Sequence, residues 1–541
     1  MNGRERVLKA LKCEETDRTP WVPFVGCHAG ALVGATAEDI LRSEDLMVAG
    51  AREAVRRYKP DGLPVAFDLQ IEAEALGCGL SWAKENPPAV NSHPLAGNMR
   101  LADLKVPGPG DGRIALALGA ARRMRANHPD IALYGLITGP FTLALHLLGT
   151  DIFMKMYDEP QEVKQLLQFA SEVGLAMAGY YLDAGCDVVA VVDPMTSQIG
   201  PDQFVQWVTP VAQPIFDAIR ARNAIGSFFV CGHAQQNLAA MCDCHCHNIS
   251  VDENIPLQFV RDVCLPRKIS FGGNMQLTTV LLLGTPVEAQ KNAIACLETG
   301  GRQGFILSPG CDLPFAVPPA NLEAIPAIVA DDYQRQVVKA IAPDRADQDR
   351  LDLEEYGHAD KVVIDIITLD SEACAPCQYM VDAVRKVAPE FDGILVWREH
   401  KIKYRESLVL MTSLMVHNVP TICIDGQIAF VSRIPPRDEL VAAIQRRINE
   451  KLKVNVQRRK ATLYVLASDK HDGVELRRRI DRAVSELGAD VTVQKVTDPQ
   501  VIASYGITPN QLPAVVLARY RLKSSRTIPE VAAIKEWIKD L

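Results

Sequence analysis

Cysteines and histidines able to bind a metal or exchange electrons stand at four places of interest in this chain. The densest group is MCDCHCHNIS, residues 241–250, with three cysteines and two histidines within six positions. The second is the pair Cys374 and Cys377 in CAPC, and the other two are Cys231 in FFVCGH and Cys311 in SPGCDLP. Zinc prefers thiolate and imidazole ligands, and C-x-x-C is also typical of disulfide exchange. The elements that position each group decide which chemistry is available to it.

Residues 1–342 alternate short β-rich runs with helical stretches, a pattern typical of a parallel α/β fold. Most of the β-rich runs are followed within a few residues by a helix-like segment. This predicts a (β/α)8 TIM barrel, in which catalytic groups follow the carboxyl ends of the strands. The expected strands are 62–68, 131–139, 187–193, 226–231, 248–252, 268–273 and 304–310.

The pattern changes beyond the barrel segment. Residues 343–359 are polar and charged and are expected to form a linker. Residues 360–452 and 458–541 show the same order, a βαβ unit followed by two strands and a closing helix, and only the first carries the C-x-x-C pair. We therefore expect two copies of one small α/β domain.

The C-x-x-C pair lies between a predicted strand and a predicted helix. Helix amides favour the thiolate of Cys374 at the helix start, and Cys377 is placed to resolve a mixed disulfide. With Pro420 as a facing cis-proline, CAPC and VPTICIDG resemble the thioredoxin/glutaredoxin superfamily, and LPAVVL with Pro513 extends the resemblance more weakly to the second copy. The alternative, a zinc knuckle, needs a second ligand pair that this domain lacks, so a redox role is favoured.

Eight motifs span nearly all of residues 2–330: RERVLKALKCEETDRTP, FDLQIEAEALG, GPFTLALHLLGT, AGCDVVAVVDP, FFVCGH, ISVDENIPL, GTPVEAQ and GFILSPGCDLPFAVPPANLEAI. With these motifs the segment resembles the uroporphyrinogen decarboxylase family, in particular its cobalamin-dependent methyltransferase branch. The resemblance implies a TIM barrel that moves a methyl group between a corrinoid and a thiol or other small acceptor. The chain has no D-x-H-x-x-G corrinoid signature, so the corrinoid is expected on a partner protein.

Decarboxylation of a tetrapyrrole is the alternative activity. The resemblance implies that true decarboxylases hold four substrate carboxylates with paired arginines in an N-terminal loop, and the corresponding residues 22–34 contain no arginine. Asp68 stands at the position of the family's pyrrole-binding aspartate. One matching carboxylate without the basic groups does not balance a tetra-anion, so methyl transfer is favoured.

The methyltransferase resemblance also implies a zinc ion that activates a thiol, bound by a His-x-Cys pair and a distant cysteine. Cys231 and Cys311 match the two cysteines, whereas Phe229 stands where the histidine is expected. His233 or Glu253 would complete the ligand set. The alternative is that the site has decayed and the cysteines are small buried hydrophobes.

The cluster Cys242–His247 precedes the strand expected at 248–252, so it belongs at the opposite end of the barrel from Cys231. Its spacing is also tighter than C-x2-C. We favour a polar turn over an accessory metal or inter-subunit site.

Further polar residues near the expected strand ends are candidates for the cavity. Each could equally hold a loop in place. Besides the redox pair, the catalytic candidates are Asp68 and Asp193, and the cofactor-binding candidates are His28, His146 and Asn274.

Composition restricts the possible partners and the cellular location of the protein. The formal net charge of −8 shows no basic surface for nucleic acid, and no apolar run approaches a membrane span. The N-terminus lacks the apolar stretch of a secretory signal, and 14 irregularly spaced cysteines favour the cytoplasm. We therefore expect a zinc-dependent methyltransferase with a corrinoid protein and a thiol-redox protein as partners. The second hypothesis is a redox-coupled binding protein with a non-catalytic barrel, which Phe229 favours.

Overall fold

The computed structural model describes residues 1–341, 356, 361–372, 374–416, 418–460, 462–468, 472–489, 491–517 and 521–539. The chain forms two compact units, Met1–Leu440 and Val441–Leu541, and each is described by itself. The expected linker, 343–359, lies outside the described residues apart from Tyr356.

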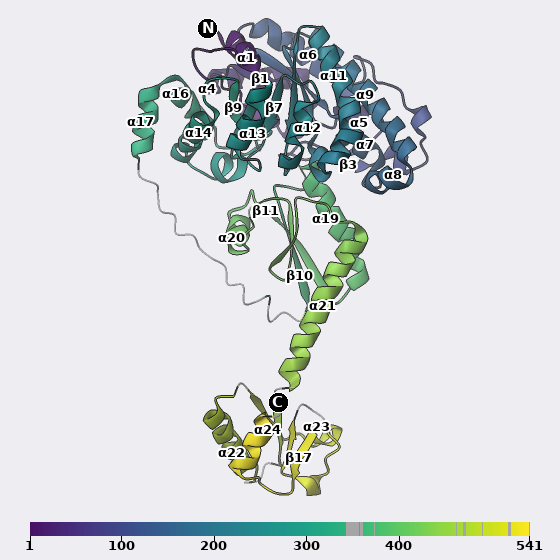
Figure 1. Cartoon of the computed structure of the whole chain (residues 1–541), viewed down its shortest axis with the longest axis vertical. Helices are drawn as coiled ribbons and strands as arrows, with labels where there is room; N and C mark the ends of the chain where they lie inside the picture. Colours follow the sequence, from purple (N-terminus) through teal and green to yellow (C-terminus); the bar gives the residue numbers. More distant parts are fainter. Residues whose placement is uncertain are drawn as a thin grey trace. The chain divides into compact units, whose positions relative to one another are not determined.

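A curled parallel sheet forms the centre of the first unit (Figure 1). In the described part of the chain it has seven strands, and all seven strands predicted from the sequence are confirmed with small shifts of their ends. In their order across the sheet they are β1 (Gly62–Pro64), β4 (Ala132–Thr138), β5 (Val188–Val192), β6 (Ile225–Val230), β7 (Asn248–Val251), β8 (Ser270–Met275) and β9 (Phe305–Pro309).

The segment around Trp21 takes the place of an eighth strand. Val22 N donates to Leu307 O in β9 at 2.9 Å, and Asp61 N, just before β1, donates to Trp21 O at 2.8 Å. The segment therefore bridges the two edges of the sheet, as a (β/α)8 arrangement requires. Sequence patterns did not reveal it because prolines at 20 and 23 interrupt the run.

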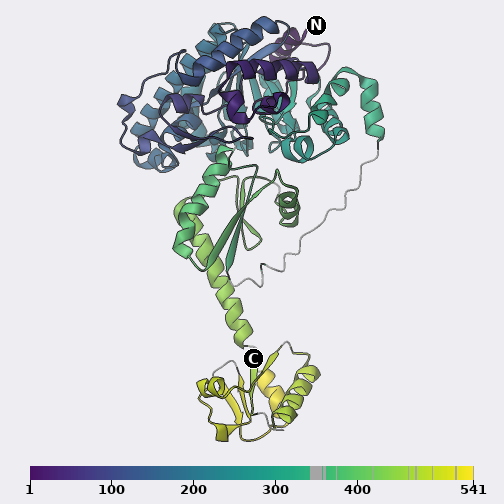
Figure 2. The same ribbon diagram turned by 180° about the vertical axis from the view of Figure 1, so that it is seen from behind.

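Helices cover the outside of this sheet (Figures 1 and 2). The strands are buried on both faces, which explains why β5 reads as an uninterrupted apolar run. The longer helices are α1 (Gly3–Leu11), α4 (Glu44–Tyr58), α6 (Gly112–Asn127), α7 (Pro140–Leu148), α9 (Pro160–Asp183), α11 (Thr209–Ala221), α13 (Leu257–Cys264), α14 (Pro286–Gly300) and α17 (Asp332–Ala340). Shorter elements are α2 (His28–Val33), α3 (Ala37–Leu41), α5 (Ile71–Ala75), α8 (Ile152–Asp158), α12 (Leu238–Cys242), α15 (Pro319–Glu323), α16 (Ile325–Ala330) and the hairpin of β2 (Gly79–Ser81) and β3 (Ala89–Ser92).

The C-x-x-C segment belongs to the same compact unit as the barrel. Its four strands follow the order β11-β10-β12-β13, with β11 parallel to β10 and the other two pairings antiparallel. The peptide bond before Pro420 is cis, as predicted. The elements are β10 (Val362–Thr368), α19 (Ala375–Val387), β11 (Leu395–Lys401), α20 (Arg405–Ser413), β12 (Thr421–Ile424), β13 (Gln427–Val431) and α21 (Arg437–Lys460).

The second unit repeats this topology. Its strand order β15-β14-β16-β17 has the same parallel and antiparallel pairings, and the bond before Pro513 is also cis. Within the described residues of both units, no helix is long and apolar enough to cross a membrane. The elements are β14 (Thr462–Leu466), α22 (Asp472–Leu487), β15 (Thr492–Val496), α23 (Pro499–Ser504), β16 (Ala514–Leu517), β17 (Arg521–Ser525) and α24 (Val531–Lys539).

Candidate functional site

A cavity of about 360 Å³ lies at the carboxyl ends of the barrel strands in the first unit. Cys231 follows β6, Glu253 follows β7 and Cys311 follows β9, and all three line it. Cys374 and Pro420 of the C-x-x-C segment line the same cavity. The ends of parallel strands are where barrel enzymes place their reactive groups, so this cavity is the candidate site.

The sulfur atoms of Cys231 and Cys311 meet in this cavity. Their Sγ atoms lie 2.9 Å apart. The hydrogen bond to Cys311 and burial raise the pKa of the Cys231 thiol well above its usual range. Two thiols this close suit either a shared metal ion or a disulfide, since both bring sulfur atoms together.

Phe229 occupies the position at which a third, imidazole ligand was expected. Its side chain is fully buried and its ring packs edge-on against Phe24 and Phe67, with centroids 5.1 Å and 5.7 Å away. These rings fill the barrel interior below the cysteines. The site therefore has an apolar side chain where the imidazole ligand was expected.

Glu253 is a half-buried carboxyl residue that lines the same cavity as the cysteine pair. Its Oε1 accepts a hydrogen bond from Leu277 N at 3.0 Å, whereas its buried Oε2 has no partner among the described residues. Burial and the charge of Asp252 raise the pKa of Glu253 to about 8. Its neighbour Asp252, which sequence analysis missed although it stands next to Glu253, accepts from Gly232 N at 2.6 Å.

His233 also lines the cavity and is exposed. Within the residues that the structure describes, no three His, Cys, Asp or Glu side chains are already close enough together to hold a metal ion. The donor chemistry of Cys231, Cys311 and the unpaired Glu253 oxygen fits zinc, but the third ligand has to move to complete the site.

The two catalytic candidates at other strand ends have structural partners. Asp193 accepts hydrogen bonds from Phe141 N at 3.1 Å and Thr142 N at 2.8 Å, so it caps the first turn of α7. Burial raises its pKa to about 6. Asp68 forms a buried ion pair with Arg113. Neither side chain is among those that line the cavity.

The three cofactor-binding candidates differ in accessibility. His28 is held on both ring nitrogens, by Phe315 O at 2.9 Å and the Tyr58 hydroxyl at 2.7 Å. Asn274 Nδ2 donates to Ile255 O at 2.8 Å. His146 alone lines the cavity, and burial lowers its pKa to about 3, so its ring is neutral.

The C-x-x-C pair presents one thiol to the cavity. Cys374, at the start of α19, is half-buried and lines the cavity, whereas Cys377 is fully buried. A hydrogen bond with Cys377 and burial raise the pKa of Cys374. This direction is opposite to the lowering expected from the helix N-terminus, because the hydrogen bond with Cys377 and then desolvation outweigh the helix amides.

The Cys242–His247 cluster lies between α12 and β7, at the other end of the barrel strands, as the sequence indicated. Its three cysteines are buried. His245 Nδ1 pairs with Asp217 at 2.8 Å, and His247 Nδ1 accepts from Gly226 N at 3.1 Å. These contacts support the polar-turn interpretation.

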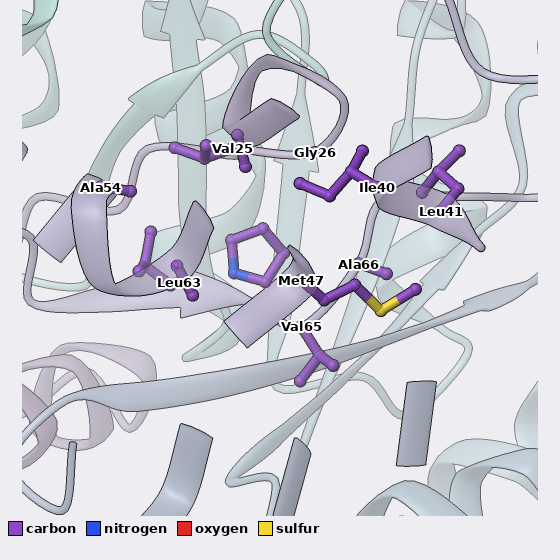
Figure 3. Close-up of a pocket in the computed structure, with 12 residues that line it drawn as sticks. Val25, Gly26, Ile40, Leu41, Met47, Ala54, Leu63, Val65 and Ala66 are labelled. Atoms are coloured by element: carbon purple, nitrogen blue, oxygen red, sulfur yellow. The ribbon is translucent and has the colours of Figure 1, made fainter. Parts of the chain in front are cut away.

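A second cavity, of about 20 Å³, lies between α3, α4 and β1 (Figure 3). It has room for about one water molecule. Its lining offers no reactive group, because it consists of side chains such as Val25, Ile40, Leu41, Met47, Leu63 and Val65. It is therefore a packing gap and not a binding site.

Comparison with known proteins shows what the barrel part of the chain is similar to. The methylcobamide:CoM methyltransferase MtbA of Methanosarcina acetivorans is 28% identical over 335 residues, covering 59% of this chain and 95% of the relative. The methylcobamide:CoM methyltransferase MtaA of Methanosarcina barkeri is 28% identical over 343 residues, covering 61% of this chain and 98% of the relative. A solved methyltransferase from Methanosarcina mazei superposes with a TM-score of 0.57 at 26% identity, over 63% of this chain and all of that one.

The match to a family model is consistent with these relatives and with the cavity at the strand ends. The model described as uroporphyrinogen decarboxylase (URO-D) covers residues 2–331, more than half of the chain. The chain therefore belongs to the uroporphyrinogen decarboxylase family.

Proposed function

We propose that this protein is a corrinoid-dependent methyltransferase, which moves a methyl group between a corrinoid on a separate protein and a thiol or other small acceptor. The names of the related methylcobamide:CoM methyltransferases support this activity. The observation that carries the proposal is the meeting of Cys231 and Cys311 at the cavity of a barrel from this family. The cavity volume, about 360 Å³, suits a small acceptor.

Zinc is the metal that we propose for this site. Cys231 and Cys311 would supply two thiolates, and Glu253 would supply the third ligand through the Oε2 atom that has no other partner. His233 is the alternative third ligand, since it lines the same cavity. When bound, zinc would keep an acceptor thiol in its thiolate form at neutral pH.

The chain's own residues prepare the cavity for this chemistry. Phe67, Leu277 and Phe315 give it apolar walls, which exclude water around a reacting thiolate and strengthen electrostatic interactions there. His146 contributes a neutral ring with a buried, unpaired Nδ1 within the described part of the chain, which suits a hydrogen bond to a polar acceptor.

We further propose that residues 360–452 and 458–541 are thioredoxin-like domains following a barrel over 1–342. The matching strand orders and the cis-prolines at 420 and 513 support one ancestral domain for both copies. Only the first copy keeps its thiols, so the second would serve docking or structure.

Two other functions remain as alternatives. Decarboxylation has little support, because Asp68 is paired with Arg113 and lies outside the cavity lining. A redox-coupled binding protein with a non-catalytic barrel is favoured by one observation, the buried Phe229 in place of the expected histidine.

The test is methyl transfer from methylcobalamin to a panel of small thiols by zinc-loaded, full-length protein, followed by the absorbance of methylcobalamin. We expect transfer above the protein-free rate, with loss in Cys231→Ala. The matched control is Cys13→Ala, which removes a half-buried thiol that does not line the cavity. Absence of transfer to every thiol would instead support the non-catalytic alternative.

A further inference from the structure

Specific contacts attach the C-x-x-C segment to the barrel beside the cavity. The side-chain amide of Gln198 donates to Ser432 O at 3.0 Å and accepts from Ile434 N at 2.9 Å. Gln378, on the same helix as the redox pair, donates to Val90 O at 2.7 Å. These hydrogen bonds hold the C-x-x-C segment at the mouth of the barrel, and the barrel contains the Cys231–Cys311 pair.

Aromatic packing reinforces the same attachment. The ring of Tyr379 stacks on His93, with centroids 6.2 Å apart, and Tyr379 is buried in the barrel's main apolar cluster. Because Tyr379 lies on α19 five residues after Cys374, this packing limits how far the start of α19 can move from the cavity.

Four thiols consequently line one cavity: those of Cys231, Cys311 and Cys374, and that of Cys27, which is buried. Cys377 lies directly behind Cys374 and is fully buried. This is the arrangement of an attacking thiol that faces a target and a resolving thiol that does not.

The barrel pair is itself close to disulfide geometry. Its sulfur atoms are 2.9 Å apart, whereas a disulfide bond measures about 2.05 Å. A small movement therefore joins them once one sulfur is oxidised. The disulfide form has no thiolates left to bind a metal, so oxidation would inactivate the site.

We propose that the Cys374–Cys377 dithiol reduces a Cys231–Cys311 disulfide within the same chain. The Cys374 thiolate attacks one sulfur of the barrel disulfide, so that bond breaks and the leaving sulfur takes a proton. Cys377, deprotonated in turn, attacks Cys374, and the second barrel sulfur leaves as a thiol. Two electrons thus pass to the barrel pair, and the CAPC pair ends as a disulfide.

The other reactants are defined by their chemistry. The oxidant is a peroxide, which converts two thiols to a disulfide and leaves as water or alcohol. A small or protein dithiol then reduces the exposed end of the Cys374–Cys377 disulfide. This reduction of the barrel disulfide by the Cys374–Cys377 pair, which we call the relay, rests on the proposed function at one point: Cys231 and Cys311 must be thiols for activity. The relay itself needs no zinc.

The experiment follows full-length, metal-free protein in which peroxide has oxidised both pairs. Limiting dithiothreitol is added, and differential alkylation with peptide mapping measures how fast the Cys231 and Cys311 thiols appear. Cys374 is held beside the barrel disulfide, so its effective concentration there is high. We therefore expect the Cys231 and Cys311 thiols to appear about tenfold or more faster in the wild type than in Cys374→Ser. Cys13→Ser should match the wild type.

A Cys377→Ser variant provides a second measurement that is independent of the first. Cys374 then has no resolving partner, so peptide mapping should find it bonded to Cys231 or Cys311 within one chain. Equal reduction rates in wild type and Cys374→Ser, or a Cys377→Ser protein with only intermolecular bonds at Cys374, would overturn the relay. Both measurements detect only the state of the thiols. A failure of methyl transfer would therefore leave the proposed reduction intact, and a failure of the reduction would leave methyl transfer intact.

Discussion

The Sγ atoms of Cys231 and Cys311 lie 2.9 Å apart at one end of the barrel, although 80 positions separate the two residues in the chain. The barrel produces this proximity because β6 and β9 run in the same direction and end on the same face. The predictions below test what the pair does and what positions the groups around it.

The barrel should bind about one zinc ion per chain through Cys231 and Cys311. Elemental analysis of purified wild type and a Cys231→Ala/Cys311→Ala variant measures this directly, and the variant should lose the metal. A Cys242→Ala/Cys244→Ala variant is the control and should retain it. Unchanged zinc in the first variant would place the metal elsewhere, with the Cys242–His247 cluster the first place to examine.

Uroporphyrinogen should not be decarboxylated at a useful rate. Residues 22–34 contain no arginine to hold its carboxylates, and Asp68 is already paired with Arg113. An assay of coproporphyrinogen formation, with a known decarboxylase as the positive control, tests this expectation. Robust turnover would exclude the methyltransferase as the main activity.

Cys374 should react before Cys377 with a limiting alkylating reagent at neutral pH. Both thiols are in a buried environment, but Cys374 reaches the cavity and Cys377 is fully covered. Peptide mapping of the reduced protein after partial labelling identifies the order. Preferential labelling of Cys377 would reverse the roles of the two cysteines, and the absence of a titratable disulfide would remove the redox role.

Asp193 should make the barrel more stable as pH falls. Its pKa is about 6 in the folded protein and near 3.8 when unfolded, so the folded state binds the proton more readily. The stability contributed by protonation is fully present below the unfolded pKa and is lost as pH rises through about 6.

Comparison with Asp193→Asn isolates this effect, since asparagine does not titrate. Between about pH 7.5 and about pH 5, the free energy of unfolding of the wild type should rise by about 1 kcal/mol relative to the variant. Urea denaturation at several pH values measures the difference. A constant difference across this range would mean that Asp193 does not change protonation there.

Gln198→Ala should slow electron transfer to the Cys231–Cys311 pair by about tenfold. The variant removes both hydrogen bonds to residues 432 and 434. Cys374 is then held less tightly at the cavity, so its effective concentration there falls. The readout is the appearance of Cys231 and Cys311 thiols after limiting dithiothreitol. Gln213→Ala is the matched control, since Gln213 also donates to a backbone carbonyl, that of Asp243, and does not line the cavity. An equal loss in both variants would show that attachment through Gln198 is not limiting.

Much of the barrel could be predicted from the sequence because its strands are buried on both faces. Such strands are continuous apolar runs with a helical segment after each, so local composition alone located all seven. Chain direction then placed Cys231 and Cys311 at the same end, and the Cys242–His247 cluster at the other. The cis-proline at 420 was likewise evident from a local motif.

Other features depended on contacts between distant parts of the chain. Asp193 was predicted to be catalytic, which stays a prediction, and the structure adds that its carboxylate accepts hydrogen bonds from the amides that begin α7. Tertiary packing brings those amides to it. Nothing in the local sequence distinguishes Gln198 from other glutamines, and its role arises from bonds to residues more than 230 positions away. The sequence alone therefore determined the strands and the end of the barrel to which each cysteine belongs. Only the tertiary structure decided which thiols share a cavity, because side-chain proximity across the fold is set by long-range packing and not by local pattern.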